Sequence, residues 1–412
     1  MRLEQGQRRG LLAKGLLLAV CVALWLWAAH ILLRTSVPSS LRLPQIDPRS
    51  LFSSSYLKHS ASYESFLDID QLLGELALLV VLALYAWRGE RLMRESAAGR
   101  VGTGMLLGML GFALVWLADI PFGLAAVWWE RRHGVSHQSY VGNLIEGFLG
   151  LGGRFVFVSL ALLVSMGLAG ALRRWWWALA APVFVGLALL SSYLSIDLIP
   201  NTHPLRNPAT AADVRELARV EGIPNTRAVV QDVSRYTTAP NAESVGFGAT
   251  RRVILWDTLL DGRFDRREVR VVMAHELGHL SHHHPLKRVW WLALFLIPAA
   301  ALVALLTRGR GGLARPEAIP LALLVFVALQ LLTAPLWNVV YRREEAEADW
   351  SALKATHDPV AARGLFRQLA ITSLANPDPP SWSYVLDADH PTIVQRIAMV
   401  DAWERRTGFG TH

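Results

Sequence analysis

The sequence predicts a mainly helical, polytopic membrane protein with seven spanning helices and a small α+β part joined to the last spans. Composition is the first reason, because 53% of the 412 residues are hydrophobic and 18% are charged, whereas soluble globular chains carry about 25% charged residues. Seven stretches approach the roughly 20 apolar residues that a spanning helix needs. Two further segments, 197–288 and 341–412, are polar and long enough to fold outside a bilayer.

The predicted spans differ in how strongly the sequence supports them. The first is uncharged and too long for the apolar core of a signal peptide, so we expect it to be retained rather than cleaved. The second is short and contains Glu75, and the third contains Asp119 and Pro121, where we expect it to bend or break. In chain order the seven are Gly15–Leu33, Leu72–Trp87, Gly102–Trp129, Phe155–Leu172, Trp175–Ile196, Val289–Thr307 and Ala318–Val340.

Charge and cysteine content exclude other classes of protein. The 41 Lys and Arg exceed the 33 Asp and Glu by 8, and many arginines, such as Arg173 and Arg308, flank apolar runs. Basic membrane flanks explain this excess better than nucleic-acid binding, so we predict membrane lipid and no nucleic acid as a partner. The single cysteine, Cys21, lies in the first span, which excludes a disulfide framework and a cysteine-ligated metal.

The first polar segment has the pattern of a small α+β unit. Asp265 and Glu268 form a capping-box pattern that opens a helix. The elements expected before it are a helix at Ala211–Glu221 and strands at Ala228–Asp232, Ser244–Gly248 and Arg252–Trp256. We therefore divide the chain into a membrane domain at 1–200, with five spans, and a second domain at 201–412 that includes the last two spans.

The helix opened by Asp265 carries an HExxH motif, His275-Glu276-Leu277-Gly278-His279. Residues four apart share one helical face, so both imidazoles can bind one metal ion. Glu276 then projects toward the open position of the metal, where it can accept a proton from the attacking water. Small Gly278 permits the close approach of a partner helix. The motif predicts a catalytic site with one Zn²⁺ per chain rather than a histidine-rich surface turn.

Catalytic zinc needs a third protein ligand while one position stays open for water. A metzincin would place histidine at position 285, where this chain has Pro285, so that class is excluded. The neighbouring His282, His283 and His284 are alternative ligands. Because Pro285 breaks the helix there, we expect these three histidines to be surface or interfacial residues.

A better source of the third ligand is the acidic run that follows the last span. Glu345 and Asp349 share one helical face, so Glu345 can bind the metal while Asp349 holds a ligand histidine through its other ring nitrogen. Glu344 and Glu347 point elsewhere, and a solvated charged face is the role that we expect for them. Composition alone leaves Glu344 open as the ligand in place of Glu345.

The position of these motifs along the chain adds a constraint. His279 precedes the span at Val289 by 10 residues, at most ~15 Å along a helix, and Glu345 follows the last span directly. Adjacent spans therefore bring the two ligand-bearing segments together, and we expect the metal at or just inside the membrane surface. Such a location suits substrates that carry a lipid or an apolar tail.

These motifs resemble those of the type I CAAX prenyl proteases, which are gluzincin-like zinc metalloendopeptidases with seven spans. The HELGH block and Arg342-x-x-Glu345-x-x-Ala348-Asp349 look like the family's two metal-binding motifs, and the resemblance selects Glu345 as the third ligand. The segment from Pro121 to Gln138 looks like the family's loop after the third span. The resemblance implies an enzyme of the cell membrane that processes the C-termini of lipid-modified or apolar-tailed peptides.

The resemblance also assigns roles to residues that spacing alone does not select. His390-Pro391 is similar to the family's C-terminal motif, so that His390 would steady the tetrahedral intermediate and Arg396 would support the site. Structural alternatives are that His390 caps a turn and that Arg396 pairs with a nearby carboxylate. Asn241 and Ala242 resemble the start of the family's edge strand, which would pair with the backbone of the substrate.

Other functions remain as alternatives. A quality-control membrane metalloprotease of the HtpX type has the same chemistry, but fewer spans and no counterpart of the 121–138 region. An intramembrane site-2 protease would need its HExxH motif inside an apolar span, and the segment 266–284 is too polar for that. A non-catalytic seven-span protein with a structural metal would have no use for Glu276 as a general base.

Overall fold

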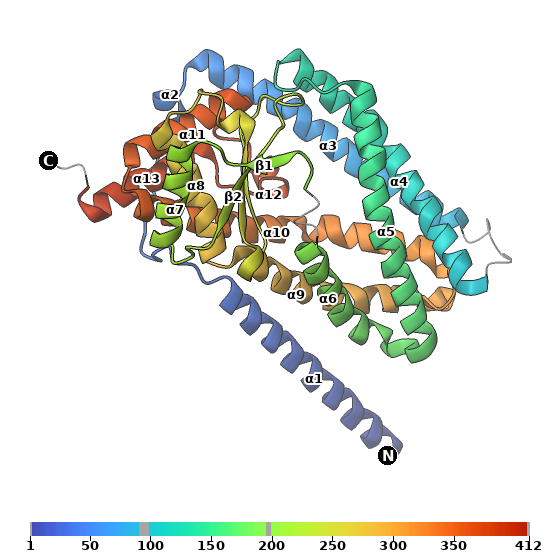
Figure 1. The fold of residues 1–412 in the computed structure, drawn as a ribbon. Coiled ribbons are helices and arrows are strands. Elements are labelled where there is room, and N and C mark those ends of the chain that lie inside the picture. The colour runs from blue at the N-terminus through green and yellow to red at the C-terminus, as the bar shows by residue number, and fades with distance from the viewer. Residues whose placement is uncertain (1, 90–98, 195–198, 410–412) are drawn as a thin grey trace.

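The computed structural model describes residues 2–89, 99–194 and 199–409, and it is mainly helical, as predicted (Figure 1). Its helices are α1 (Arg2–Leu32), α2 (Pro48–Leu51), α3 (Ser54–Arg88), α4 (Gly99–Arg132), α5 (Tyr140–Leu172), α6 (Trp176–Leu194), α7 (Pro208–Val220), α8 (Arg266–Ser281), α9 (His284–Leu306), α10 (Ile319–Thr356), α11 (Pro359–Ser373), α12 (Ser381–Leu386) and α13 (Ile393–Thr407). Its strands are β1 (Thr202–Pro204), β2 (Arg227–Gln231), β3 (Ala242–Val245) and β4 (Arg252–Trp256).

The long apolar helices are arranged as a closed ring. Each of α3, α4, α5, α6, α9 and α10 packs on the next, and α10 packs on α3. Helix α1 lies outside this ring and projects away from the rest of the chain (Figure 1). It contacts α9, where Trp25 Nε1–H donates to the Leu294 carbonyl at 2.8 Å. The membrane part is thus one continuous helical wall with an additional helix attached to it.

Six helices of the described chain are long and apolar enough to cross a membrane. They correspond to six of the seven predicted spans, and the remaining predicted span lies in α5, whose apolar part among the described residues is the shorter Val158–Leu172. Helix α4 continues through Pro121, so the span does not break at that proline, and the alternative of a bend stays a prediction. The predicted fifth span ends at Ile196, which lies outside the described residues; α6 itself ends at Leu194.

A four-stranded mixed sheet, in the order β1-β2-β4-β3, lies beside α8, the helix that carries the HExxH motif. Strands β2 and β4 are parallel, and β1 and β3 pair antiparallel at the two ends. The predictions for β2 and β4 hold within one residue. Strand β3 starts two residues earlier than predicted and β1 was not predicted. The sheet therefore presents β3 as an edge strand next to α8.

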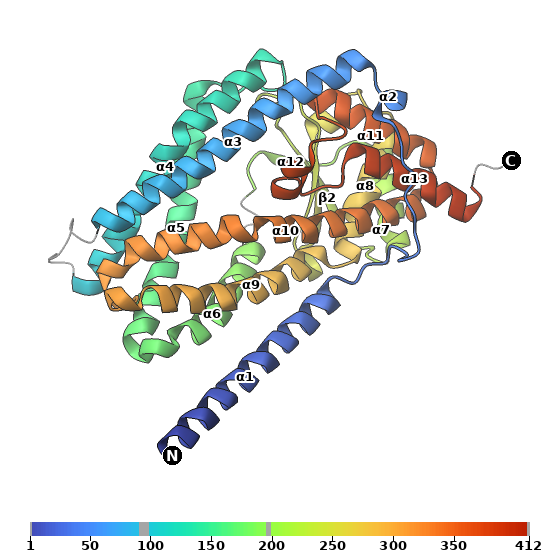
Figure 2. The same cartoon turned by 180° about the vertical axis from the view of Figure 1, so that it is seen from behind.

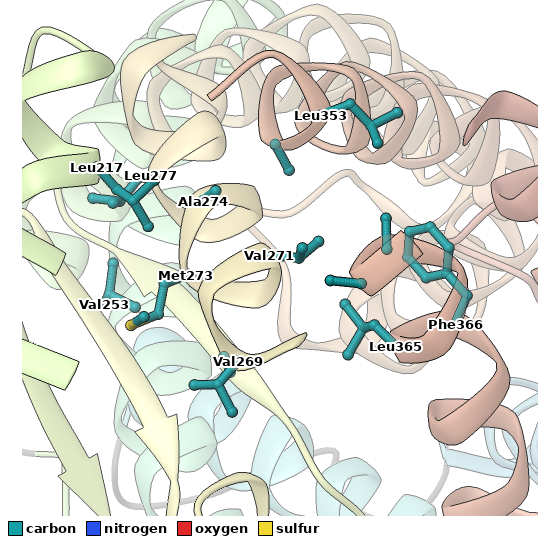
Figure 3. Close-up of a cluster of buried hydrophobic side chains, with 14 of the residues drawn as sticks. Leu217, Val253, Val269, Val271, Met273, Ala274, Leu277, Leu353, Leu365 and Phe366 are labelled. Carbon is teal, nitrogen blue, oxygen red and sulfur yellow. The ribbon is translucent and has the colours of Figure 1, made fainter. Parts of the chain in front are cut away.

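Helix α8 is the centre of the hydrophobic core outside the spans. Its capping box forms as predicted, with Asp265 and Glu268 each accepting from the backbone N–H of the other. Met273 points toward Val253 of β4, whereas Val271 points toward Leu365 of α11 (Figure 3). Each fully buried side chain of this size contributes about 1.5–3 kcal/mol to stability. Packing on both sides fixes α8, and with it the HExxH motif.

The segment 33–47, between α1 and α2, forms a strap over this core. It runs past α13 (Figure 2), and the side chains of Val37, Leu41 and Ile46 pack against the core cluster. The strap therefore connects the helix outside the ring to the part of the chain that carries the HExxH motif. The division of the chain into two domains at residue 200 stays a prediction.

Helices α8 and α10 approach each other closely at Gly278. A Cβ atom at this position would lie 3.1 Å from Ser351 Cβ and 3.4 Å from the Ala348 backbone. We expect Gly278→Leu to lower the free energy of unfolding by about 1–3 kcal/mol, because overpacking would force the two helices apart. Thermal unfolding in detergent measures this loss. The control Gly167→Leu should be close to neutral, since an added Cβ there meets nothing within 4 Å; equal losses in both variants would contradict the explanation.

Candidate metal centre and active site

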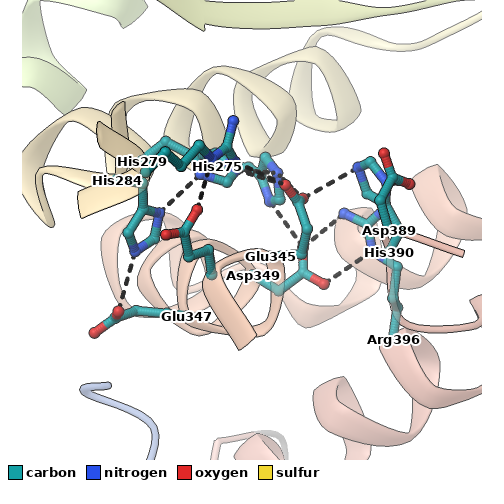
Figure 4. A network of polar contacts seen from close by, with 11 residues as sticks. His275, His279, His284, Glu345, Glu347, Asp349, Asp389, His390 and Arg396 are labelled. Atoms are coloured by element: carbon teal, nitrogen blue, oxygen red, sulfur yellow. Dashed lines mark hydrogen bonds and ion pairs between the residues drawn. The ribbon is translucent and has the colours of Figure 1, made fainter. Parts of the chain in front are cut away.

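Three potential metal ligands meet where α8 faces α10. His275 and His279 lie one turn apart on α8, and Glu345 reaches them from α10 (Figure 4). The two histidine Nε2 atoms are 3.1 Å apart, and the Glu345 oxygens lie 3.1 Å from His275 Nε2 and 3.2 Å from His279 Nε2. All three side chains are buried. The structure thus brings together the three residues predicted to bind the metal.

The chemistry of these three groups fits a divalent metal. His275 Nδ1 lies 2.8 Å from Asp349 Oδ1, so Nδ1–H donates to that carboxylate and a neutral ring presents a lone pair at Nε2. The buried Glu345 Oε2 faces this lone pair at 3.1 Å, so neither of the two atoms donates to the other. Ligands about 2.0–2.1 Å from a tetrahedral zinc lie about 3.3–3.4 Å from each other. The observed separations of 3.1–3.2 Å are close to that value.

Asp349 and Arg396 support the ligand histidine from behind. Both Asp349 oxygens accept from Arg396, at 2.8 Å from Nε and 2.7 Å from Nη2. Asp349 is buried, and Arg396 lies over the Phe366 ring at 4.3 Å. The carboxylate can therefore hold the His275 ring in one orientation while the guanidinium holds the carboxylate.

Asp349→Asn is expected to lower metal affinity by about 10- to 100-fold, because the amide fixes the His275 tautomer less firmly. Competition with a chelator of known affinity measures the change. Asp401→Asn is the matched control, because Asp401 also pairs with an arginine, Arg363 at 2.8 Å, but does not line the cavity. Unchanged metal affinity in Asp349→Asn would refute this role.

Glu276 lies beside the ligands in the same cavity. It is 7% exposed, and burial raises the pKa of its carboxyl group, partly offset by the nearby ligand histidines and by a hydrogen bond from Ser244. A raised pKa brings a general base closer to the pH at which it works. Glu276 therefore lies where its carboxylate can exchange a proton with a water molecule in the cavity.

His390 reaches the centre from the loop before α13. Its Nε2 lies 3.2 Å from Glu345 Oε2, and its Nδ1 lies 2.6 Å from Asp389 Oδ1 (Figure 4). The side chain is half exposed, unlike the ligand histidines. It therefore lies at the open side of the centre, where it can meet a substrate.

The cavity over the ligands has a volume of about 550 Å³. Its lining includes β3 with Asn241 and Ala242, and it includes the apolar side chains of Leu365, Phe366 and Leu369 from α11. Asn241 Oδ1 accepts from the Ala242 N–H at 2.9 Å, and its carbonyl accepts from the Trp256 N–H at 3.0 Å. These bonds fix the start of the edge strand over the ligands. The α11 wall was not predicted from the sequence.

Three predictions about charged residues near the centre are wrong. His284 is fully buried rather than interfacial, with Nδ1 2.8 Å from His279 Nδ1. Glu347, expected on a solvated face, is also buried and contacts His284. Glu344 is buried as well and accepts from Arg288 Nε at 2.7 Å. Glu344 and Glu347 gain partners from α9, which begins at His284, and His284 itself lies between α8 and α10. Helical spacing within α10 could not reveal these contacts.

The loop after α4 joins the membrane part to the cavity wall. Its residues 135–137 pair with residues 236–238: His137 N–H donates to the Tyr236 carbonyl at 2.8 Å, and Thr238 N–H donates to the Val135 carbonyl at 3.1 Å. This segment leads directly into Asn241 and β3. The loop singled out in the sequence thus holds one wall of the cavity.

Comparison with known proteins identifies the family. The sequence model for peptidase family M48 matches residues 204–404. A protease HtpX homolog of Acidiphilium cryptum is 30% identical over 213 residues, which are 46% of this chain and 72% of that protein. The chain belongs to peptidase family M48. It is a metalloprotease, as its motifs predicted.

Other relatives extend the similarity of this M48 chain beyond the protease motifs. The CAAX prenyl protease 1 homolog of Arabidopsis thaliana is 26% identical over 73% of this chain and 74% of its own length. The uncharacterized metalloprotease YhfN of Bacillus subtilis is 31% identical, and the match spans 55% of this chain but only 56% of YhfN. The crystal structure of S. mikatae Ste24p has the same fold, with a TM-score of 0.67 and 19% identity over 93% of this chain and 97% of that one.

Proposed function

We propose that this M48 metalloprotease is a zinc-dependent endopeptidase of the cell membrane that cleaves peptides close to a lipid-modified or apolar C-terminal tail. The observation that carries the proposal is the relation of the metal ligands to the spans. Glu345 lies on the same continuous helix as the last span, and α9 begins at His284, directly after α8 ends at Ser281. A peptide that reaches the ligands therefore has its remaining residues next to the membrane.

The roles proposed for the ligands follow from their atoms. His275 and His279 would hold zinc through Nε2 and Glu345 through its carboxylate. When bound, the ion supplies Lewis acidity, which lowers the pKa of a water molecule from about 15.7 to about 7 and polarises a carbonyl group. Asp349 holds the His275 ring through Nδ1 and Arg396 holds Asp349 in turn.

The protons in this reaction are assigned to Glu276. Its carboxylate takes a proton from the attacking water and returns it to the nitrogen of the leaving amine. His390 is proposed to donate to the oxygen that develops negative charge, since its ring lies at the open side of the centre. The exposed edge of β3, beginning at Asn241 and Ala242, is proposed to pair with the backbone of the substrate.

The substrate class is suggested by the walls of the cavity and by a relative. The lining of the cavity includes the apolar side chains of Leu369 and of the almost fully buried Leu365 and Phe366, which suits aliphatic residues beside the cleaved bond. The Arabidopsis relative is named a CAAX prenyl protease 1 homolog. A peptide with two aliphatic residues near its C-terminus and a lipid on the preceding cysteine fits both observations. The aliphatic residues match the apolar lining of the cavity, and the lipid can lie in the adjacent membrane.

The test measures how fast the full-length protein in lipid nanodiscs cleaves two quenched peptides of this sequence type. One peptide is farnesylated and the other is not. We expect cleavage that a chelator abolishes and added zinc restores. We also expect kcat/KM to be at least about 10-fold higher for the farnesylated peptide, which about 1.4 kcal/mol of additional contact would supply. Equal cleavage of both peptides would refute the substrate class, and a zinc-loaded chain that cleaves neither would refute the function.

A second candidate is the degradation of damaged membrane proteins. It is supported by the 30% identity to a protease HtpX homolog over 46% of this chain. This function predicts cuts at internal sites of an unfolded membrane protein that lacks a lipid-modified C-terminus. Mass spectrometry of the fragments separates such internal cuts from the single C-terminal cut expected above.

A further inference from the structure

We propose that His284 is a positioning residue for the metal ligand His279, and that Glu347 and the strap hold it in place. This inference rests on the proposed function, because it concerns the same metal centre. It adds a support for the second histidine from a residue outside the HExxH motif, His284, and from a glutamate of the acidic run, Glu347, that is not a ligand.

The contacts form one buried hydrogen-bond network that starts at the metal ligand and leads away from the metal centre. His279 Nδ1 lies 2.8 Å from His284 Nδ1, and His284 Nε2 lies 3.1 Å from Glu347 Oε2 (Figure 4). His284 has no exposed surface, and Glu347 is 2% exposed. In Figure 4, His284 lies between His279 and Glu347, on the side of His279 that faces away from Glu345.

The hydrogen-bonding capacity of each group fixes the tautomers of His279 and His284 in this network. An ionised carboxylate only accepts, so His284 Nε2–H donates to Glu347. The other nitrogen of a neutral His284 ring then carries a lone pair, and His279 Nδ1–H must donate to it. This leaves His279 Nε2, the atom nearest to Glu345, free to bind a metal. His284 therefore does for His279 what Asp349 does for His275.

Glu347, at the outer end of this hydrogen-bond network, is held by the strap and by α9. The backbone N–H of Ser36 donates to Glu347 Oε1, and Lys287 Nζ lies 3.4 Å from Glu347 Oε2. Arg343, which lies one turn before Glu347 on α10, also holds the strap, because its guanidinium donates to the Leu33 carbonyl at 2.9 Å. The segment that follows the first span thus contributes to the support of a metal ligand.

The same geometry argues against His284 as a metal ligand. Its Nδ1 faces the nitrogen of His279 that points away from Glu345, and its Nε2 faces Glu347. Both nitrogens are therefore already in use. His282 is also unsuited, since its Nδ1 lies 3.5 Å from Glu347 Oε1, at the outer end of the same hydrogen-bond network.

The test measures metal affinity and metal geometry in four variants of the full chain. His284→Leu and Glu347→Met remove the acceptors, and we expect each to lower zinc affinity by about 10- to 100-fold. His284→Gln should recover most of the affinity, because its amide offers both an acceptor and a donor. The control His283→Asn should match the wild type, since His283 is exposed and asparagine tolerates its left-handed backbone, with φ of 59°.

Two further measurements separate positioning from general stability. The visible spectrum of the cobalt-loaded protein should change in His284→Leu and return toward the wild-type spectrum in His284→Gln. Thermal unfolding of the chelator-treated protein shows whether the variants fold. Wild-type zinc affinity in His284→Leu, or a loss that His284→Gln does not recover in a folded protein, would overturn the inference. A wild-type chain that binds no metal would instead overturn the proposed function.

Discussion

Glu276→Gln is expected to keep one metal ion per chain while peptide cleavage falls by about 10²- to 10⁴-fold, the usual contribution of a general base. Glutamine keeps the size and the hydrogen bond with Ser244 but cannot take a proton from water. None of the three ligand atoms belongs to Glu276, so metal binding should not change. Metal analysis of the purified variant and cleavage of a quenched peptide measure the two effects.

The matched control is Glu268→Gln on the same helix. Glu268 accepts the Asp265 N–H at the start of α8, a contact that glutamine can keep. It lies about two helical turns before His275 and does not line the cavity. This variant should retain both metal and activity. If Glu276→Gln cleaved peptides at the wild-type rate, another group would have to be the base and the assignment would be wrong.

Glu345→Gln is expected to reduce metal affinity by more than the roughly 10- to 100-fold that is typical for a residue behind a ligand. The change replaces a charged ligand by a neutral one between two imidazoles that lie 3.1 and 3.2 Å away. Activity at limiting zinc should fall with affinity. A titration with zinc in which both metal binding and peptide cleavage are measured tests whether the loss of affinity causes the loss of activity.

Glu344→Gln is the informative control for this prediction. Helical spacing alone left Glu344 and Glu345 open as the third ligand. In the structure Glu344 accepts from Arg288, whereas Glu345 faces both ligand histidines. Glu344→Gln should therefore bind zinc with near wild-type affinity. The opposite ranking of the two variants would show that the wrong glutamate was assigned.

Much of the centre could be predicted because its signals are local. The capping box at Asp265 and the i,i+4 pair of His275 and His279 both lie within one helix, where spacing determines direction. Glu345 required more, since a distant residue can be selected only through the family resemblance. The spans were predictable because an uncharged apolar run of about 20 residues is typical of a membrane-spanning helix and rare elsewhere.

The errors have physical causes that the local pattern does not contain. Strand β3 ends at Val245 because Gly246 and Gly248 adopt left-handed backbone conformations, with φ of 80° and 60°, which interrupt a strand. Strand β1 has three residues, too few for an alternating pattern. Glu347 was placed on a solvated face because its partners, His284 and Ser36, come from other parts of the chain.

The continuity of α10 has a mechanical consequence. This helix has 38 residues and therefore measures ~57 Å from end to end. A rod of that length that tilts by about 5° to match a thinner bilayer displaces one end by roughly 5 Å relative to the other. Contacts such as Gly278 against Ala348 oppose that motion locally. We therefore expect the thickness of the surrounding lipid to affect how the Glu345 carboxylate is aligned with the two imidazoles, because one helix carries both the last span and Glu345.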